Sequence, residues 1–204
     1  MDLILIRHPV VALAAGICYG HSDIALAMPP QAEITRLTAR LEALGAGRSL
    51  HFHSSTLSRC TEIARPLAAY FGSQVQIDPR LREIDFGRWE MQAWDAIPRS
   101  EIDLWAADVE HACTHGGESV AALSERVQSW LSELEIELEV RGRAQTAAET
   151  AVVLTHAGVM RVLAALALRL PLAACLDWQL ELGGICQLRR RPGPAGWGLV
   201  SWNG

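Results

Sequence analysis

Short apolar runs separated by stretches of helical periodicity are the feature that most limits what this chain can fold into. The runs are suited to buried strands and lie at residues 3–6, 50–53, 75–77 and 151–154. Strands that alternate with helices favour a parallel sheet covered on both faces. The sequence therefore predicts an α/β fold whose central sheet is mostly parallel.

Helical periodicity fills the segments between these runs. Apolar residues spaced three or four apart from Ile34 to Leu44 predict a helix that Gly45 and Gly47 end. Further helices are predicted over residues 57–71, 120–138 and 159–170. Near the end, residues 185–188 and 199–202 predict a pair of strands around a proline-rich loop, RRRPGPAG, at 189–196.

Ionisable side chains follow three of the predicted strands. The first apolar run ends on Arg7 and His8, the run at 151–154 leads into His156, and the run at 50–53 leads into a helix that carries Arg59. Because the carboxyl ends of parallel strands meet at one edge of a sheet, we expect these side chains to lie together.

Arginine and histidine, without lysine, favour phosphate chemistry at that edge. All 18 basic residues are arginine, which excludes a Walker lysine and a Schiff-base lysine. A guanidinium group can donate two parallel hydrogen bonds to two oxygens of a phosphate group. A neutral imidazole can attack phosphorus. Neighbouring guanidinium charge keeps such an imidazole unprotonated. Phosphoryl transfer also needs a proton donor, and the segment LREIDFGRWE offers Glu83, Asp85 and Glu90, among which spacing does not choose.

Composition narrows the remaining function classes. The chain has 204 residues, so we expect one domain over residues 1–204, and no apolar run approaches the roughly 18 residues that span a bilayer. A net charge of −5 argues against nucleic acid as a partner. Five dispersed cysteines without a Cys-x-x-Cys pair fit a reducing cytoplasm. We expect no metal or cofactor; His51 and His53 share a strand face that we interpret as packed under a helix.

Four blocks of the sequence resemble the histidine phosphatase superfamily, the phosphoglycerate-mutase-like proteins. The blocks are LIRH, SSTLSRC, LREIDFGRWE and VVLTHAG, and they occur in the family's order over nearly the whole chain. The resemblance implies a three-layer α/β/α sandwich and hydrolysis of a small-molecule phosphomonoester. It implies that His8 is the nucleophile, that Glu83 is the proton donor, and that the phosphate pocket is made by Arg7, Arg59 and His156.

A finer resemblance is to α-ribazole phosphatases of cobalamin nucleotide-loop assembly. It is carried by GICYGHSD at residues 16–23, DFGRWE and GGES. It implies substrate contacts at Tyr19, Gly20 and Ser22, and we add Gly158 of the block VVLTHAG. Three residues depart from the family pattern, and one of them is His115, which precedes GGES where proline is common. Pro9 follows the nucleophile and lacks an N–H, and Met91 stands where many relatives have glycine.

Other functions stay open at this point. A broad-specificity sugar-phosphate phosphatase or a phosphoglycerate mutase would use the same residues. A phospholigand-binding regulator without catalysis is the alternative outside enzymes. A dinucleotide-binding oxidoreductase is set aside because no Gly-x-Gly-x-x-Gly follows the first strand. The sequence also leaves the oligomeric state open, a homodimer included.

Overall fold

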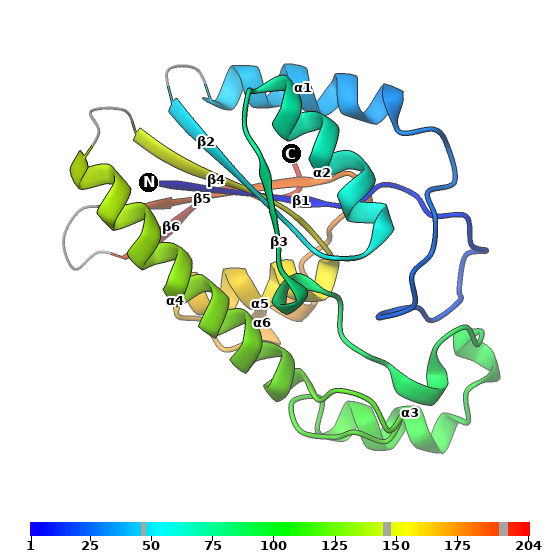
Figure 1. Ribbon diagram of the computed structural model, residues 1–204. Helices are drawn as coiled ribbons and strands as arrows, with labels where there is room; N and C mark the ends of the chain where they lie inside the picture. The colour runs from blue at the N-terminus through cyan, green and yellow to red at the C-terminus, as the bar shows by residue number, and fades with distance from the viewer. Residues whose placement is uncertain (46–47, 145–147, 192–195) are drawn as a thin grey trace.

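The computed structural model describes residues 1–45, 48–144, 148–191 and 196–204. At its centre is a six-stranded sheet (Figure 1). The strands are β1 (Asp2–Arg7), β2 (Arg48–Ser54), β3 (Val75–Ile77), β4 (Ala148–Thr155), β5 (Ile185–Arg190) and β6 (Trp197–Ser201). Each contains or overlaps one of the predicted apolar runs.

The sheet is mostly parallel, as predicted. Its strand order is β3-β2-β4-β1-β5-β6. β2 pairs in parallel with β3 and β4, and β4 pairs in parallel with β1. Only β5 runs the other way, antiparallel to both β1 and β6. The carboxyl ends of β1, β2 and β4 therefore lie side by side at one edge.

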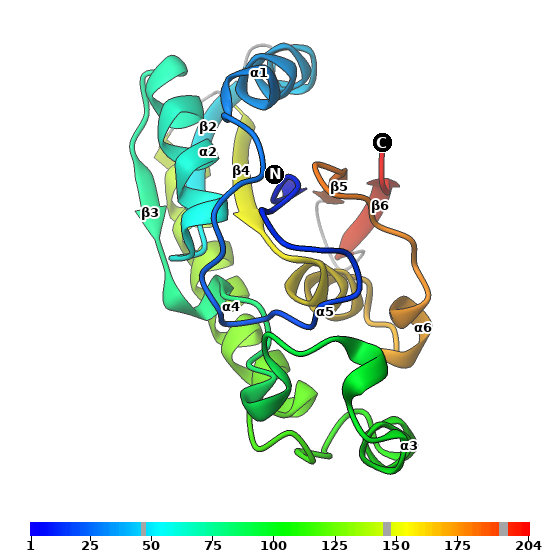
Figure 2. The same cartoon turned by 90° about the vertical axis from the view of Figure 1, so that its right-hand side faces the viewer.

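Helices cover both faces and make three layers. On one face lie α1 (Gln31–Gly45) and α2 (Ser58–Tyr70), and on the other lie α4 (Val120–Ala144) and α5 (Ala157–Leu168) (Figures 1 and 2). None of the helices in the described ranges is long and apolar enough to cross a membrane. The predicted α/β/α sandwich is confirmed.

The two faces of β1 show why its sequence is apolar throughout. Leu3 and Leu5 pack into the core under α4 and α5, whereas Ile4 and Ile6 pack into the core under α1 and α2. All four side chains are fully buried. A strand buried on both faces cannot alternate apolar and polar residues, so the apolar run continues until the strand reaches the edge.

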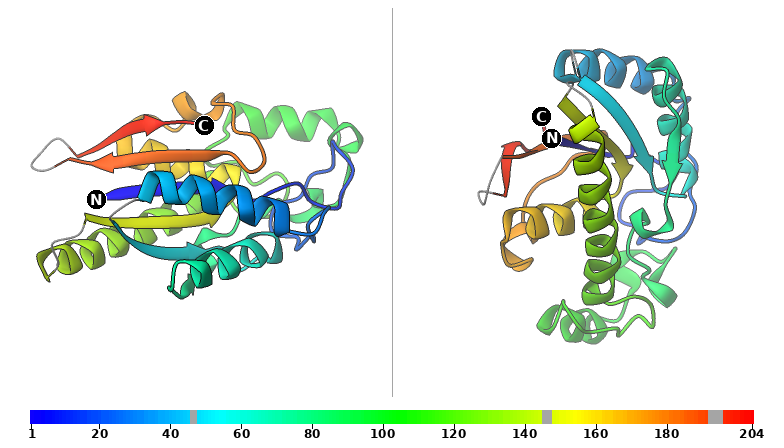
Figure 3. Two further views of the ribbon diagram at one scale, coloured as in Figure 1. Left: turned by 90° about the horizontal axis from the view of Figure 1, so that it is seen from above. Right: turned by 60° about the vertical axis from the view of Figure 1, so that its left-hand side comes forward.

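Several elements were not predicted. They are α3 (Arg99–Ala107), α6 (Ala173–Leu176) and three short 3₁₀ turns at Pro79–Leu81, Gly87–Trp89 and Trp94–Ala96. A small separate core of Cys18, Trp89 and Ile97 joins the segments outside the sheet. As Figure 3 shows, α3 lies apart from the sandwich.

One predicted boundary is wrong. The loop expected at 189–196 begins later, because Arg189 and Arg190 belong to β5, and the Arg189 guanidinium donates to the buried Asp2 carboxylate at 2.8 Å. That pairing needs an extended backbone beside β1. Residues 192–195 of this loop, and Gly47 of the predicted helix stop, lie outside the described residues.

The interpretation of His53 as a packed strand residue is confirmed. Its ring meets Trp130 of α4 edge-on, with 5.5 Å between ring centroids, and only 3% of the residue is exposed. Nε2 of His53 has no hydrogen-bond partner in the described structure. Burial lowers the pKa of His53 to about 4 and so keeps the ring neutral.

We expect the variant His53→Leu to lose less folding stability on acidification than the wild type does. The unfolded state binds the His53 proton below its ordinary pKa of 6.5, but the folded state does so only near pH 4, so wild-type stability is lost as the pH falls through this window. By pH 4 the wild-type loss should exceed that of the variant by roughly 3 kcal/mol. Urea unfolding at pH 7, 5.5 and 4 measures this difference.

The matched control is His111→Leu, because the His111 side chain is 67% exposed. It should follow the wild-type pH curve. If the two variants lose stability in parallel as the pH falls, the buried His53 ring is not the acid-sensitive group.

Candidate active site

Three strand ends bring the predicted residues together. β1 and β4 are in register up to Arg7 and Thr155, and the His8 N–H donates to the Thr155 carbonyl at 3.0 Å. His156 is the next residue after β4, so its ring lies 5.2 Å from that of His8. β2 ends beside β4, and α2 then starts and places Arg59 against His156. Shared register at one sheet edge therefore builds the cluster.

Nε2 of His8 is available as a nucleophile. The Nδ1 atom lies 2.7 Å from the carbonyl oxygen of Pro9. A carbonyl oxygen only accepts, so Nδ1 carries the proton and Nε2 keeps its lone pair. The residue is 2% exposed, and burial, together with the charges of Arg59 and Arg7, lowers the pKa of His8 to about 3. The imidazole is therefore neutral at neutral pH.

Arg59 is a fully buried charge held by three acceptors. Its Nη1 and Nη2 atoms donate to the carbonyls of Ser22 and Gly20, each at 2.7 Å, and its Nε donates to His156 Nδ1 at 3.3 Å. The guanidinium also lies over the ring of Tyr19, 5.3 Å from its centroid. These contacts fix the direction of the guanidinium fork.

His156 is neutral and oriented by its neighbours. Because Arg59 Nε only donates, Nδ1 of His156 accepts and Nε2 carries the proton. That Nε2–H lies 2.9 Å from the hydroxyl of Ser55. Burial and the charge of Arg59 hold the pKa of His156 well below its ordinary value. His156 thus adds no charge to the cluster.

The guanidinium of Arg7 is held on one side by a backbone carbonyl and lines the cavity. Its Nη1 donates to the Leu180 carbonyl at 2.6 Å, whereas its buried Nε has no hydrogen-bond partner among the residues that the structure describes. Burial lowers the pKa of Arg7, and the neighbouring Tyr19 and Glu83 act in the opposite direction. An arginine stays charged at any working pH, so this N–H is a charged donor.

Glu83 is placed by a glycine. One carboxylate oxygen accepts from the Gly158 N–H at 3.0 Å and the other from the Ile84 N–H at 3.1 Å. A Cβ on residue 158 would stand 2.3 Å from the Glu83 carboxylate. The start of α5 can therefore hold the carboxylate only because residue 158 is glycine.

These groups line one small cavity of about 110 Å³. Its lining residues are Arg7, His8, Ile17, Tyr19, Arg59, Glu83 and Trp94. Two guanidinium groups, a neutral imidazole and a carboxylate facing one small space can bind a phosphate group, attack it and exchange a proton with it. His156 and Gly158 lie directly behind this lining, through Arg59 and Glu83.

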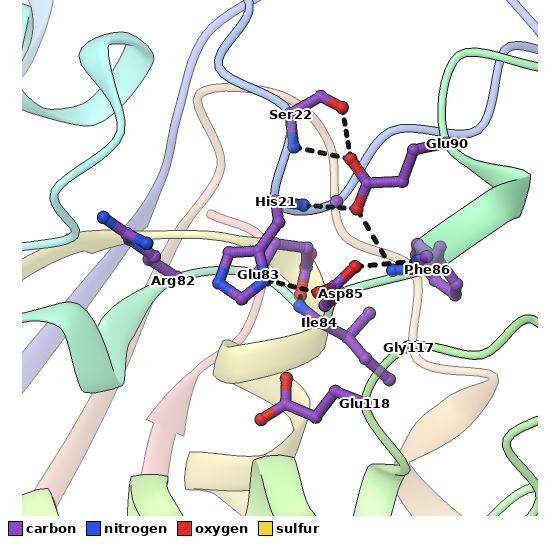
Figure 4. A network of polar contacts seen from close by, with 12 residues as sticks. His21, Ser22, Arg82, Glu83, Ile84, Asp85, Phe86, Glu90, Gly117 and Glu118 are labelled. Carbon is purple, nitrogen blue, oxygen red and sulfur yellow. Dashed lines mark hydrogen bonds and ion pairs between the residues drawn. The ribbon is translucent and has the colours of Figure 1, made fainter.

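The structure uses the three candidate acids in different ways (Figure 4). Asp85 closes a turn by accepting from the Gly87 N–H at 2.7 Å. Glu90 accepts from the N–H groups of His21 and Ser22 at 2.7 and 2.6 Å and from the Ser22 hydroxyl. Glu83 alone reaches the cavity. Sequence spacing had left this choice open.

Gly20 and Ser22 lie beside the cavity without lining it. A Cβ on Gly20 would stand 1.9 Å from the Ile84 carbonyl oxygen, so the segment can approach Ile84 only with glycine there. The Ser22 hydroxyl donates to Glu90, and both residues turn their carbonyls to Arg59. Direct contact of Gly20 or Ser22 with a substrate stays a prediction.

Sequence reasoning missed three contributors to the site. Ile17 and Trp94 line the cavity, and Glu90 anchors the segment that holds Arg59. Ile17 lies within the motif GICYG and pairs with Ala93 in an isolated bridge, which brings Trp94 alongside. No local signal in the sequence indicates that long-range bridge.

Backbone geometry explains the departure at Met91. Met91 has φ of +64°, in the left-handed region that glycine adopts most easily, and its N–H donates to the Cys18 carbonyl at 2.8 Å. The residue after Glu90 must turn in this way to return the chain to Cys18. Pro9 costs the site no contact with His8, since its carbonyl, and not its nitrogen, orients the ring.

Comparison with known proteins adds an independent line of information. The family model of the histidine phosphatase superfamily (branch 1) matches residues 3–204. The glucosyl-3-phosphoglycerate phosphatase of Mycobacterium tuberculosis is 31% identical over 159 residues, which cover 74% of this chain and 67% of that protein. The adenosylcobalamin/α-ribazole phosphatase of Escherichia coli is 29% identical over 195 residues, covering 90% and 87%.

Solved structures repeat the same architecture. The mycobacterial glucosyl-3-phosphoglycerate phosphatase in complex with inorganic phosphate superposes with a TM-score of 0.81 at 27% identity. The match covers 100% of this chain and 97% of that one. The fold is thus similar to that of a named phosphatase.

We expect Glu90→Gln to destabilise the fold by about 2 kcal/mol at pH 7, because an amide accepts fewer of the charge-assisted hydrogen bonds from residues 21, 22 and 86. Burial acts to raise the pKa of Glu90, but the hydrogen bonds from Ser22, His21 and Phe86 outweigh it and the pKa lies below 4.5. The stabilisation is therefore complete above pH 4.5 and is lost as the pH falls through the lower, folded-state pKa.

Thermal unfolding of wild type, Glu90→Gln and the exposed control Glu62→Gln from pH 7 to 3 measures this effect. The gap between wild type and Glu90→Gln should narrow below pH 4.5, and Glu62→Gln should show no gap. A gap that widens on acidification would contradict the anchoring role of the carboxylate.

Proposed function

The chain belongs to the histidine phosphatase superfamily, and from this premise we propose that it hydrolyses α-ribazole 5′-phosphate through a phosphohistidine at His8. Glu83 is the proton donor, and Arg7, Arg59 and His156 form and orient the phosphate pocket. The observation that carries the proposal is the state of His8. Its ring is neutral, its Nδ1–H is bound to the Pro9 carbonyl, and the residue lines a cavity together with two guanidinium groups.

The pocket suits a phosphate dianion. The guanidinium groups of Arg7 and Arg59 are charged donors that line one small cavity. Such donors stabilise the negative charge of the transferring phosphoryl group better than water does, because they are already oriented. The same charges keep His8 unprotonated and ready to react.

The reaction proceeds in two balanced steps. In the first, the Nε2 lone pair of His8 forms a bond to phosphorus while the bond from phosphorus to the ester oxygen breaks, and a proton on Glu83 passes to that oxygen to release an alcohol. In the second, Glu83 takes a proton from water as the water oxygen attacks phosphorus. The bond from phosphorus to His8 then breaks, which releases inorganic phosphate and restores the neutral ring.

The choice of α-ribazole 5′-phosphate rests on the segment at residues 16–23 and on the similarity to the Escherichia coli enzyme over 90% of the chain. Tyr19 of that segment lines the cavity, which supports a substrate contact there. We also propose that residues 1–204 form one domain and act in the cytoplasm in cobalamin nucleotide-loop assembly. All five cysteines are free thiols, as a reducing compartment requires.

Phosphate release tests the proposal directly. With EDTA present, we expect the wild type to release phosphate from α-ribazole 5′-phosphate with a kcat/KM at least about tenfold above that for 3-phosphoglycerate or a glucose phosphate, since pocket contacts discriminate by such factors. The variant His8→Ala should release none. With a substrate labelled in its phosphate group, rapid quenching into alkali, which preserves phosphohistidine, should trap the label on the wild-type protein alone.

The outcomes separate the alternatives. Equal, slow release from all esters would leave a broad phosphatase and remove the α-ribazole assignment. Isomerisation of phosphoglycerate without net phosphate release would show a mutase. Phosphate binding without labelling of His8 would show a phospholigand-binding protein. The control His111→Ala, at an exposed histidine, should match the wild type.

We expect Gly158→Ala to disable proton donation while sparing phosphate binding. The added Cβ would stand 2.3 Å from the Glu83 carboxylate and displace it, and general acid catalysis contributes about 10²- to 10⁴-fold. kcat should therefore fall about a hundredfold for an alkyl phosphate, whose alkoxide needs a proton, and only a fewfold for p-nitrophenyl phosphate, whose leaving group does not.

Steady-state kinetics on both esters measure the contrast. Gly198→Ala is the control, because a Cβ there meets the Arg191 side chain at an ordinary 3.6 Å. If kcat of Gly158→Ala fell equally for both esters, the substitution would be disturbing the local structure in general and not the Glu83 carboxylate.

A further inference from the structure

A second and larger cavity lies behind the proposed proton donor. Its volume is about 320 Å³, almost three times that of the phosphate pocket. It lies among α3, the start of α4, α5 and α6, away from the sheet; Figure 2 shows these elements grouped together. Apart from Gly158 and Arg161, all its lining side chains are apolar: Ile84, Phe86, Trp105, Val109, Val120, Leu123, Val162, Leu172 and Leu176.

The two cavities share a wall. Glu83 lines the phosphate pocket, and its hydrogen-bond partners Gly158 and Ile84 line the apolar cavity. Trp94 of the phosphate pocket meets Phe86 of the apolar cavity edge-on, with 5.5 Å between ring centroids. The Glu83 carboxylate thus stands at the boundary between a charged space and an apolar one.

The chemistry of the proposed reaction constrains where the leaving group can lie. The leaving oxygen must lie opposite the attacking Nε2 of His8 and within reach of Glu83. Atoms attached to that oxygen then continue past Glu83, away from Arg7 and Arg59. The two backbone partners of Glu83, Gly158 and Ile84, border the apolar cavity.

We propose that this apolar cavity binds the leaving group and selects phosphomonoesters whose alcohol carries an apolar ring system of about bicyclic aromatic size. The inference rests on the proposed function and deepens it. Removing such a ring from water onto apolar walls is favourable, whereas a sugar would lose its hydrogen bonds to water there.

Arg161 adds one polar contact at the cavity. Its Nε and Nη2 atoms both donate to the Trp178 carbonyl, at 3.3 and 3.0 Å, which fixes the guanidinium against the chain, and Nη1 makes no hydrogen bond within the described residues. A leaving group with one hydrogen-bond acceptor on an otherwise apolar ring matches this lining.

The test compares esters that break the same kind of bond. Ribose 5-phosphate, α-ribazole 5′-phosphate and 2-(1-naphthyl)ethyl phosphate are all phosphates of primary alcohols, and the last two carry a bicyclic aromatic ring. For the wild type we expect kcat/KM for both aromatic esters to exceed that for ribose 5-phosphate by about ten- to a hundredfold.

Two variants alter the cavity without touching the phosphate pocket. Leu176→Glu places a charge on the wall, and Val109→Trp fills space. Both should remove most of the preference by lowering kcat/KM for the aromatic esters about tenfold or more, with ribose 5-phosphate unchanged. The matched controls are Leu104→Glu and Val140→Trp, at residues 64% and 62% exposed, and both should keep the wild-type preference.

The outcomes distinguish the subsite from the chemistry. Turnover of all three esters at equal efficiency, or cavity variants that keep the aromatic preference, would overturn the apolar subsite while leaving the phosphatase in place. Equal losses on aromatic and sugar esters in the variants would do the same. No hydrolysis of any ester by the wild type would overturn the proposed function, and the leaving-group assignment with it.

Discussion

The buried guanidinium of Arg59 is the constraint around which the rest of the site is organised. A charge removed from water must find hydrogen-bond partners inside the protein, and here these are two backbone carbonyls and one ring nitrogen. The carbonyls belong to Gly20 and Ser22, a segment outside the sheet, which must therefore be fixed as firmly as the sheet itself. Glu90 does this by accepting from the N–H groups of residues 21 and 22. One buried charge thus explains why this segment is anchored by an acid.

Burial makes a histidine neutral wherever it occurs, so a lowered pKa does not by itself identify a catalyst. His53 is buried and neutral beneath Trp130, and its ring packs edge-on against that indole. His8 differs because its Nδ1–H is tied to a carbonyl and its cavity also holds arginine and glutamate side chains. Position at a strand end, and not the pKa, separates the two rings.

The parts that sequence predicts well are those set by local pattern. The apolar runs of β1 and β4 locate the strands, and strand register then brings His8 and His156 together without further information. The contributions of Trp94 and Glu90 depend on long-range contacts of irregular segments, for which no periodicity exists. Sequence spacing did not choose among Glu83, Asp85 and Glu90, and only the resemblance to the family pointed to Glu83. The structure supplies a physical reason, because the glycine at residue 158 leaves room for the Glu83 carboxylate. Met91 shows the reverse case, in which a positive φ explains why glycine is usual at that position.

The arrangement separates the chemistry from the choice of substrate. The groups proposed to handle the phosphoryl transfer come mainly from the ends of β1 and β4 and from α2. The two strands are buried on both faces by the two cores, and α2 packs in one of these cores. The apolar cavity is built from α3, α6, the segment that carries Ile84 and Phe86, and the first turns of α4 and α5. Substitutions there can change the shape offered to a leaving group while the register that aligns His8 with Arg59 stays intact. Glu83 links the two regions, because it lines the phosphate pocket and its hydrogen-bond partners Gly158 and Ile84 line the apolar cavity. The proton that we propose it carries must reach the oxygen atom at which phosphoryl group and leaving group part.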